Sequence, residues 1–440
     1  MLEFVRSKTH PKNIFFINAQ TLKDKVDLGA LLSRYSRSDK DAETLYQEEF
    51  VTNDDRGKEF YAKVFGQYGD ESISELVPLG FAVCLENIPI LWSTYILHYR
   101  TLSAIEKSTR YVKAFDYYKP KHNSNATESF NQRSKQQIQD YNLEIKNTED
   151  RLIKELKITD LTNKAVVRAL RARALDECRT LLPLSTFTSI GIMSNLRSWL
   201  NILTKEKVRN GSSLYVRDLI DPLITLFKDN FPSIFSQDKI DYLVKSENII
   251  YSSKLELQII EDDEFVAPHV NKVENFELIY TPDIGPTMDY LPYIEQIDRI
   301  KKIKPVREYE MLDFTITIPN VDLATFRDIQ RHRYFTIIIN RWDNYQSEEQ
   351  ELTLLSSPMS NTIDITIKGN LRQWTHAIEL RTQEQGHFNY RQIFQQCGKM
   401  IARDLNIDKK QLFPYADWRT DKEIGLGRLK SEMKKMNSGL

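Results

Sequence analysis

The chain has 440 residues with 61 basic and 62 acidic side chains, which gives a formal net charge of −1 at pH 7. Its length is usually too great for one hydrophobic core and sufficient for two. The balanced charge disfavours a protein that coats nucleic acid or binds an anionic membrane surface, since both depend on a strongly basic face.

Neither the cysteines nor the N-terminus indicates export. Cys84, Cys178 and Cys397 form no C-x-x-C pair and lie in apolar or helical contexts, so we expect buried free thiols in a reducing compartment. The first 12 residues lack the apolar core of a signal peptide. The most apolar run, residues 76–97, is interrupted by prolines and polar residues and indicates a strand and a buried helix rather than a membrane span. A cytoplasmic protein is expected.

The first half of the chain predicts a strand over residues 79–87 and a helix that starts near Pro89. A loop rich in arginine and hydroxyl side chains follows over residues 98–111, with the sequence H-Y-R-T-L-S-A-I-E-K-S-T-R-Y. Residues 112–178 are predicted to form a largely helical insert. Its parts are a polar stretch and two stretches of helical periodicity, over residues 121–137, 138–157 and 160–178.

The second half of the chain predicts a similar order of elements. Alternating apolar residues over 312–319 and 363–367 are typical of half-buried strands. A helix is predicted from Val321 and another over residues 370–383, where Asn370 would be the N-cap. The triplet R-H-R at 331–333 lies between the first helix and the second strand.

Two blocks show that the second half repeats the first. The residues Phe81, Asn87 and Arg100 align with Phe314, Asn320 and Arg333 at a constant offset of about 233 positions. The segment N-L-R-S-W at 195–199 aligns with N-L-R-Q-W at 370–374 at an offset of about 175 positions. The shorter second offset reflects the insert in the first half. The chain therefore predicts a repeated α+β unit, with a boundary in the polar stretch near residues 237–247.

The loop 98–111 resembles the signature R-H-R-x-x-S-x-N-E-x-S-x-R-Y of the flavin-dependent thymidylate synthases. The matching residues are Arg100, Ser103, Glu106, Ser108, Arg110 and Tyr111, and the departures are His98, Tyr99 and Ile105. The segment R-T-L-L-P that starts at Arg179 resembles the R-x-x-L-P block of the same family. The second half keeps the R-H-R triplet and the motif N-x-R-x₈-R, as Asn370, Arg372 and Arg381.

This resemblance implies an α+β fold of two fused units, each an antiparallel sheet packed against helices. Copy 1 would cover residues 1–240, including the insert 112–178, and copy 2 would cover residues 241–440. In the family, dUMP is methylated to dTMP with FAD, NADPH and methylenetetrahydrofolate. A homodimer of two-copy chains would imitate the tetramer of the family.

A nucleotide monophosphate requires cationic and hydroxyl donors around its phosphate. Planar guanidinium groups and the hydroxyl groups of short side chains are well suited to bind a phosphate dianion, and Ser108, Arg110 and Arg179 provide such donors. The resemblance implies that Glu106 lies between nucleotide and flavin. The full set of predicted nucleotide contacts is Glu106, Ser108, Arg110, Tyr111, Arg179, Asp328 and Arg331.

Methyl transfer builds negative charge on the pyrimidine, which a fixed cation stabilises in the transition state. The family uses the last arginine of N-x-R-x₈-R, so Arg381 is predicted to be catalytic. Copy 1 has Glu206 at that position, and a carboxylate would repel the developing charge. The predicted flavin contacts are Ser72, which lies in a block resembling G-H-E-[ST] with Asp70 in place of histidine, and Arg331, His332, Arg333, Asn370, Arg372 and His376.

The losses in the two copies are complementary. We therefore expect one composite site, with the E-x-S-x-R-Y loop and Arg179 from copy 1 and the R-H-R triplet and Arg381 from copy 2. No metal is expected, because the histidines have no metal-ligand spacing. A pyrimidine deoxynucleotide is the expected small-molecule partner, and neither nucleic acid nor a membrane is expected to bind.

Several alternatives remain open at this point. The substrate could be a different pyrimidine nucleotide, or the chain could be a non-catalytic descendant that binds a nucleotide or a partner protein. RNA binding is disfavoured by the net charge. In purely structural terms, Glu106 and Arg110 could form an ion pair along a helix that extends through the loop. Arg381 could simply end a helix, where the dipole favours a cation.

Overall fold

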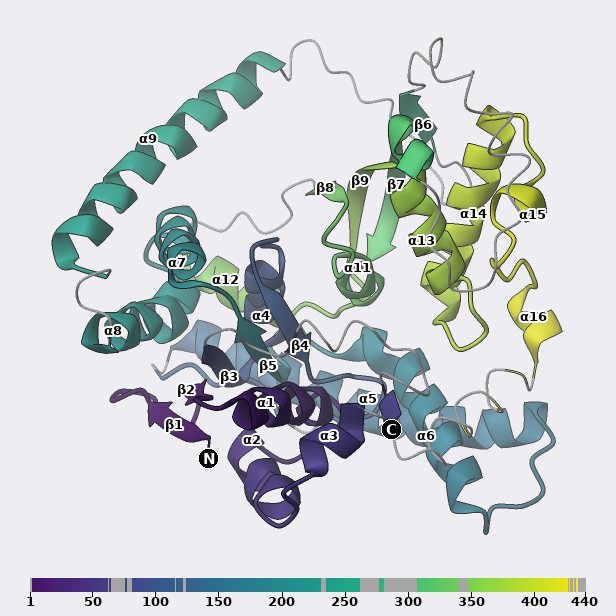
Figure 1. The fold of residues 1–440 in the computed structure, drawn as a ribbon, viewed down its shortest axis with the longest axis horizontal. Helices are drawn as coiled ribbons and strands as arrows, with labels where there is room; N and C mark the ends of the chain where they lie inside the picture. The colour runs from purple at the N-terminus through teal and green to yellow at the C-terminus, as the bar shows by residue number, and fades with distance from the viewer. Residues whose placement is uncertain are drawn as a thin grey trace. The chain divides into compact units, whose positions relative to one another are not determined.

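The computed structural model describes most of the chain. The described residues are 2–61, 63–64, 76, 81–114, 116–121, 124–230, 235–261, 277–280, 307–339, 347–425, 427, 430 and 433. Two compact units are present (Figure 1). Unit 1 comprises Met1–Gln139, Leu182–Pro268 and Tyr345–Ser357, and unit 2 comprises Asp140–Leu181, His269–Asn344 and Pro358–Leu440. Each half of the sequence thus contributes one segment to the unit that is otherwise built from the other half.

Unit 1 contains a five-stranded antiparallel sheet in the order β1-β2-β3-β5-β4. Its strands are β1 Glu3–Arg6, β2 Ile14–Asn18, β3 Phe81–Pro89, β4 Ser103–Glu106 and β5 Phe187–Met193. The predicted strand over 79–87 is present as β3, displaced toward the C-terminus. The loop predicted over 98–111 contains a strand, β4, whose partner β5 lies far along the chain.

Unit 2 contains a four-stranded antiparallel sheet in the order β6-β7-β9-β8. Its strands are β6 Glu277–Tyr280, β7 Asp313–Asp322, β8 Thr336–Ile339 and β9 Thr362–Asn370. The order matches β2-β3-β5-β4 of unit 1. Phe314, Ile316 and Ile318 are buried on alternate positions of β7, as predicted for a half-buried strand. The prediction of two antiparallel sheets packed against helices is therefore confirmed.

Both sheets carry the same irregularity at the same place. Asn87 and Asn320 have φ angles of 53° and 54°, and the strand register shifts beside each of them. Asparagine tolerates this left-handed conformation better than most residues. Each asparagine lies three residues before the helix that leads to the arginine segment, α4 at Ile90 and α11 at Leu323. The repeat seen in the sequence is thus also present in the backbone.

The helices of unit 1 come from all three of its segments. Their bounds are α1 Leu22–Tyr35, α2 Ala42–Leu45, α3 Arg56–Tyr61, α4 Ile90–Leu97, α7 Leu196–Asn210, α8 Asp221–Asn230, α9 Gln237–Glu261 and α12 Glu348–Leu355, with π-helical turns at Tyr46–Phe50 and Val216–Ile220. Helix α12 comes from the second half of the chain. Its Glu351 is fully buried, and the carboxylate accepts hydrogen bonds from the backbone N–H groups of Leu214, at 2.7 Å, and Tyr215, at 3.1 Å.

Helix α5, Asn125–Glu155, belongs partly to each unit and starts earlier than predicted. The stretch 121–137 is polar by composition, but Phe130, Ser134, Ile138 and Tyr141 are buried at helical spacing. That spacing places one stripe of the polar stretch against other parts of the protein. The expectation that helical structure would begin near residue 138 is therefore wrong.

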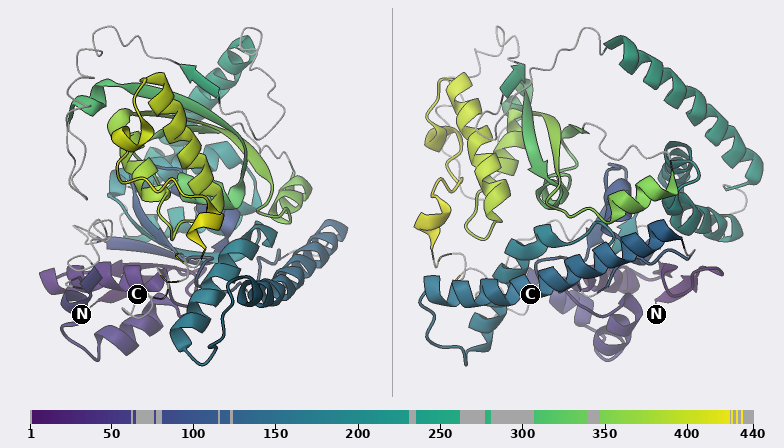
Figure 2. Two further views of the ribbon diagram at one scale, coloured as in Figure 1. Left: turned by 90° about the vertical axis from the view of Figure 1, so that its right-hand side faces the viewer. Right: turned by 180° about the vertical axis from the view of Figure 1, so that it is seen from behind.

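The helices of unit 2 include two that lie side by side on one face of its sheet, α13 Leu371–Arg381 and α14 Phe388–Asp404 (Figures 1 and 2). The others are α6 Lys164–Cys178, α11 Leu323–Ile329, α15 Lys409–Leu412 and α16 Asp421–Ile424, with short 3₁₀ turns at Arg179–Leu181 and Arg307–Met311. Helix α13 begins as predicted. The Asn370 side chain accepts from the backbone N–H of Gln373, whose own side chain accepts from the Asn370 N–H.

Candidate functional site

The strongest concentration of predicted site residues lies in unit 2, around Asp328 of α11. The Asp328 carboxylate is 2.8 Å from Nη2 of Arg179 and 4.0 Å from Nη1 of Arg331. Arg179 also lies 3.6 Å from the carboxylate of Asp176. Burial alone would raise the pKa of Asp328, but the guanidinium groups of Arg179, Arg331 and Arg381 outweigh burial and hold that pKa well below its usual range.

Arg381, the predicted catalytic residue, is the last residue of α13 and is held on three sides. Its Nε donates to Nε2 of His332 at 2.6 Å, and its Nη2 donates to the backbone oxygen of Asp328 at 3.1 Å. The guanidinium carbon lies 5.2 Å from the ring centroid of Tyr390. Among the described residues, the Nη1 group of Arg381 has no hydrogen-bond partner. The side chain is half-buried, so a fixed cation keeps donors available for a ligand.

His332 is buried and connects Arg381 to Tyr334. Because its Nε2 accepts from Arg381, its proton resides on Nδ1, which donates to the Tyr334 hydroxyl at 2.6 Å. Burial, and then the nearby charge of Arg381, lower the pKa of His332 well below its ordinary value. The imidazole is therefore neutral at physiological pH and holds Arg381 through its lone pair.

Unit 1 has a different pair at the corresponding positions. The repeat aligns Tyr99 with His332 and Glu206 with Arg381. The Tyr99 hydroxyl donates to the Glu206 carboxylate at 2.6 Å, and the Asn210 side chain donates to the same carboxylate at 3.2 Å. Both halves thus keep a hydrogen bond between these two positions, but the cation of unit 2 is replaced by a carboxylate in unit 1.

The loop of unit 1 brings its predicted nucleotide contacts together. Glu106 ends β4 and is buried, and its carboxylate accepts from Ser93 at 2.7 Å and Thr188 at 3.3 Å. Ser108 follows it, and the Ser108 hydroxyl accepts from the Arg110 N–H at 3.3 Å. The Arg110 guanidinium carbon is 5.7 Å from the ring centroid of Tyr111. Because Ser103–Glu106 is a strand, the alternative of an ion pair along a continuous helix is wrong.

The remaining predicted flavin contacts are partly engaged by the protein itself. Asn370 caps α13, and Arg372 forms an ion pair with Glu310. Arg331 and His376 are exposed, and the His376 ring lies 5.7 Å from that of Tyr334. Arg333 is half-buried. Ser72 lies outside the described residues.

The structure places Arg179 in a different unit from the one that the sequence motif predicted. The R-x-x-L-P block assigned it to copy 1, whereas it belongs to unit 2 and pairs there with Asp328. Sequence reasoning also missed Asp176, Tyr334 and Tyr390. Tyr390 could have been found, because Tyr215 occurs at the same repeat offset.

The donor chemistry of unit 2 fits a flavin diphosphate in part. Arg331 and Arg333 are cationic donors next to the fixed His332, and such donors suit a diphosphate. Asn370 and Arg372 contribute less than expected, since their side chains already have protein partners. Among the described residues, no group of three His, Cys, Asp or Glu side chains could hold a metal ion.

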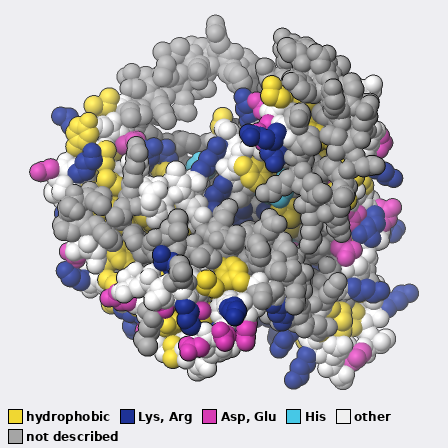
Figure 3. Space-filling model, in the orientation of Figure 1, with side chains coloured by type: hydrophobic (Ala, Val, Ile, Leu, Met, Phe, Trp, Pro, Cys, Tyr) yellow, Lys and Arg dark blue, Asp and Glu magenta, His cyan; other side chains and the backbone are white. Residues whose placement is uncertain are grey.

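The surface shows mixed charge. On the face seen in Figure 3, basic and acidic side chains are interspersed among the described residues. This agrees with the formal net charge of −1. No described helix is long and apolar enough to cross a membrane.

Comparison with known proteins identifies the first half of the chain. Residues 19–233 match the family model described as thymidylate synthase complementing protein. The chain is 25% identical to a UPF0159 protein of Thermoplasma acidophilum, covering 93% of this chain and 98% of that protein. It is also similar to UPF0159 proteins of Chlamydia pneumoniae, 25% identical, and Chlamydia muridarum, 24% identical, each over 92% of both chains. The resemblance drawn from the loop and the R-x-x-L-P block is therefore confirmed, and residues 19–233 form a domain of the thymidylate synthase complementing protein family.

Proposed function

We propose that the protein methylates dUMP to dTMP, using FAD, methylenetetrahydrofolate and NADPH. The observation that carries this proposal is the arrangement of Arg381. Its guanidinium is fixed by His332, the Asp328 carbonyl and Tyr390, and its Nη1 group has no hydrogen-bond partner among the residues that the structure describes. A cation fixed in this way stabilises negative charge on a pyrimidine without reorganising during the reaction.

The other residues divide into binding roles. In unit 2, Arg331 and Arg179 supply positive charge around Asp328, whose backbone oxygen accepts from Arg381. In unit 1, the loop Glu106–Tyr111 carries the hydroxyl, carboxylate and guanidinium groups of the family signature. Arg331, Arg333 and His376 would hold FAD, which supplies hydride chemistry when it is bound. In this proposal His332 remains neutral and keeps the Arg381 guanidinium in place, and it is not itself a proton donor to the substrate.

The proposal is tested by the visible spectrum and by turnover. The purified full-length protein is expected to be yellow or to take up added FAD, and to form dTMP from dUMP with methylenetetrahydrofolate and NADPH. Arg381→Ala should lower turnover by at least about 100-fold, as expected when a group that stabilises the transition state is removed, while the flavin spectrum is retained. An Arg381→Ala variant with full activity would contradict the assignment of the catalytic cation.

A second candidate is a non-catalytic protein that binds a nucleotide. Two observations favour it: Arg179 is already paired with the buried Asp328, and Glu206 has replaced the cation in unit 1. A colourless protein that takes up no FAD but binds dUMP in calorimetry would support this candidate over the enzyme.

A third candidate keeps the chemistry but changes the nucleotide. Asp328 is an anion at a position expected near the base, and it could select a ring that offers an amino group. Parallel assays with dUMP and dCMP separate the two substrates, and turnover of dCMP alone would replace dUMP in the proposal.

A further inference from the structure

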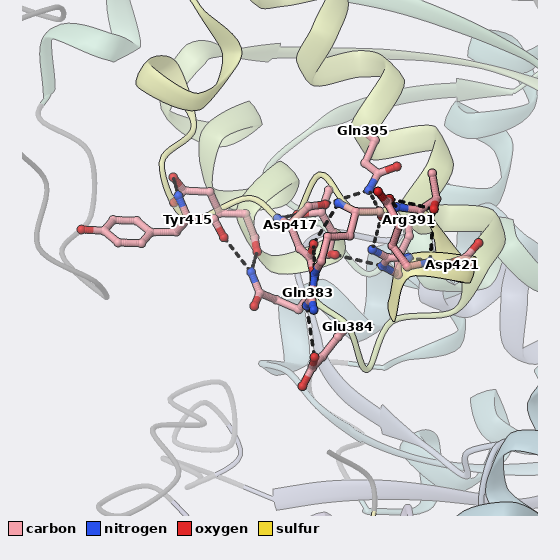
Figure 4. Close-up of polar contacts among 12 residues, drawn as sticks. Gln383, Glu384, Arg391, Gln395, Tyr415, Asp417 and Asp421 are labelled. Atoms are coloured by element: carbon pink, nitrogen blue, oxygen red, sulfur yellow. Dashed lines mark hydrogen bonds and ion pairs between the residues drawn. The ribbon is translucent and has the colours of Figure 1, made fainter. Parts of the chain in front are cut away.

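The turn that follows Arg381 is hydrogen-bonded to the C-terminal part of the chain (Figure 4). Thr382 makes three of the hydrogen bonds of this turn. The Thr382 backbone oxygen accepts from Nε of Arg391 at 2.9 Å, and its hydroxyl accepts from the Asp417 N–H at 3.0 Å and donates to the Ile378 oxygen at 2.7 Å. The residue directly after Arg381 is therefore held by two hydrogen bonds to distant residues and one within its own helix.

Arg391 of α14 connects this turn to the segment 415–421. It is 1% exposed, its Nη2 donates to the Arg419 backbone oxygen at 3.0 Å, and its Nη1 forms an ion pair with Asp421. Gln395, one turn further along α14, donates to the backbone oxygens of Asp417, at 2.7 Å, and Arg419, at 3.0 Å. Figure 4 shows these contacts converging from α14 on the C-terminal segment.

The segment also holds the other side of the turn. The Gln383 side chain donates to the backbone oxygens of Glu379, at 2.6 Å, and Tyr415, at 2.8 Å. Gly386 leaves no room for a side chain, since a Cβ there would lie 2.8 Å from Cγ of Arg391 and 3.0 Å from the Arg381 oxygen. The backbone on both sides of Arg381 is thus fixed by groups that do not touch the site.

Unit 1 has no equivalent of this arginine. At the offset of about 175 positions that aligns Trp199 with Trp374, Gly211 aligns with Gly386 and Tyr215 with Tyr390. The residue aligned with Arg391 is Val216, which is buried. The half that has lost the cation of Arg381 therefore also lacks the arginine that secures the following turn.

Stability alone does not account for a buried arginine at this position. Well-packed apolar residues often stabilise a fold as much as a buried ion pair does. Val216, which is buried at the aligned position of unit 1, shows that an apolar residue fits at this place in the repeat. A cation that acts in a transition state has a stricter requirement, because a displacement of about 1 Å can reduce turnover by about 100-fold.

We propose that Arg391 is a positioning residue that holds Arg381 in its reactive orientation, with the segment 415–421 as its anchor. Arg391 acts through Thr382 and does not touch the substrate. The inference rests on the proposed function only in that it treats Arg381 as catalytic.

The experiment compares Arg391→Met and Arg391→Lys with Cys397→Ala in the full-length protein. Cys397 is a free, fully buried cysteine in the same helix and makes no side-chain hydrogen bond to the turn among the described residues, so its variant controls for loss of stability. Arg391→Met is expected to lower kcat by about 10- to 100-fold with little change in KM, and Arg391→Lys should lower it less. Cys397→Ala should keep kcat at temperatures where all variants remain folded. Equal kcat in Arg391→Met and wild type would overturn the proposal.

A second readout does not depend on turnover. The Nε–H resonance of Arg381, assigned by its loss in Arg381→Lys, should be protected from solvent exchange in the wild type and lose that protection in Arg391→Met. Asp421→Asn, a milder change at a half-exposed partner, should give a smaller effect in the same direction. Unchanged protection in both variants would refute the positioning role, whereas a wild type without turnover would refute only the proposed function.

Discussion

Arg179 and Asp328 form a buried ion pair, and this changes what Arg179 does. The Arg179 side chain is 4% exposed and that of Asp328 is 11% exposed, so water contributes little to the solvation of either charge. Two buried charges are tolerable only as partners, and removing one leaves the other without compensation. Arg179 therefore supports the fold in addition to its proposed role in nucleotide binding.

We predict that Arg179→Ala lowers the free energy of unfolding by about 3 kcal/mol, because Asp328 loses its nearest cation. Urea denaturation measures this loss. The double variant Arg179→Ala, Asp328→Asn should recover part of it, since the amide carries no charge. A double variant as unstable as the sum of both single variants would show that the two side chains are not coupled.

His332 should make stability depend on pH. Its folded pKa lies well below the ordinary histidine value of 6.5, because of burial and the charge of Arg381, so only the unfolded chain takes up a proton near pH 6.5. The His332 contribution is thus fully present above about pH 6.5. It decreases as the pH falls toward the folded pKa, by up to about 1.4 kcal/mol per pH unit.

Chemical denaturation between pH 7.5 and about pH 5 tests this dependence. His332→Asn should remove most of the slope. His98→Gln is the matched control, because His98 is exposed and lies in unit 1, so its replacement should leave the His332 contribution unchanged. An identical slope in the wild type and His332→Asn would exclude His332 as its source.

At the scale of elements, hydrophobic periodicity and capping predicted the structure well wherever they are local. Helix α13 with its Asn370 cap and the alternating strand β7 both follow from patterns within about ten residues. Strand β4 could not be predicted, since four residues carry little pattern and its partner β5 lies far along the chain. Helix α5 was predicted too short because its buried stripe includes Ser134, a polar residue.

The two N-caps allow a prediction with a built-in control. Asn195 and Asn370 occupy the same place in the repeat, and each side chain accepts from the backbone N–H three residues later. Replacing either by alanine should cost about 1 kcal/mol of stability. Only Asn370→Ala should also weaken FAD binding, measured by flavin fluorescence, and only slightly, because the Asn370 side chain already accepts from the Gln373 N–H. If both variants bind FAD like the wild type, Asn370 caps α13 but takes no part in FAD binding.

At the scale of the whole molecule, the repeat and the motifs did not predict how the chain is divided between the two compact units. The sequence places Arg179 in copy 1, whereas the compact unit that contains it is built mainly from the second half. The reason is the exchange of segments, with residues 140–181 in unit 2 and residues 345–357 in unit 1. Internal sequence similarity shows that two segments are alike, but it does not show which compact unit each segment packs into.

We predict that fragments 1–268 and 269–440 do not fold separately. The first would lack α12, whose Glu351 accepts from the backbone N–H groups of Leu214 and Tyr215, and the second would lack Arg179 beside Asp328. Each fragment alone should show no cooperative thermal transition, while co-expression should restore a complex with one. A cooperative transition in either isolated fragment would contradict the exchange.

The Tyr99–Glu206 pair also has an evolutionary consequence. Replacing Glu206 alone by arginine would bury a guanidinium opposite the Tyr99 phenol, with Arg209 5.9 Å from the Tyr99 ring and no imidazole to accept the hydrogen bond that His332 accepts in unit 2. A change of Tyr99 alone to histidine would place an imidazole against the Glu206 carboxylate, which favours the protonated imidazole, but would leave position 206 without a cation. Each single change leaves one of the two positions without the partner it has in unit 2, so both must change together before unit 1 could acquire an arginine–histidine pair like Arg381–His332.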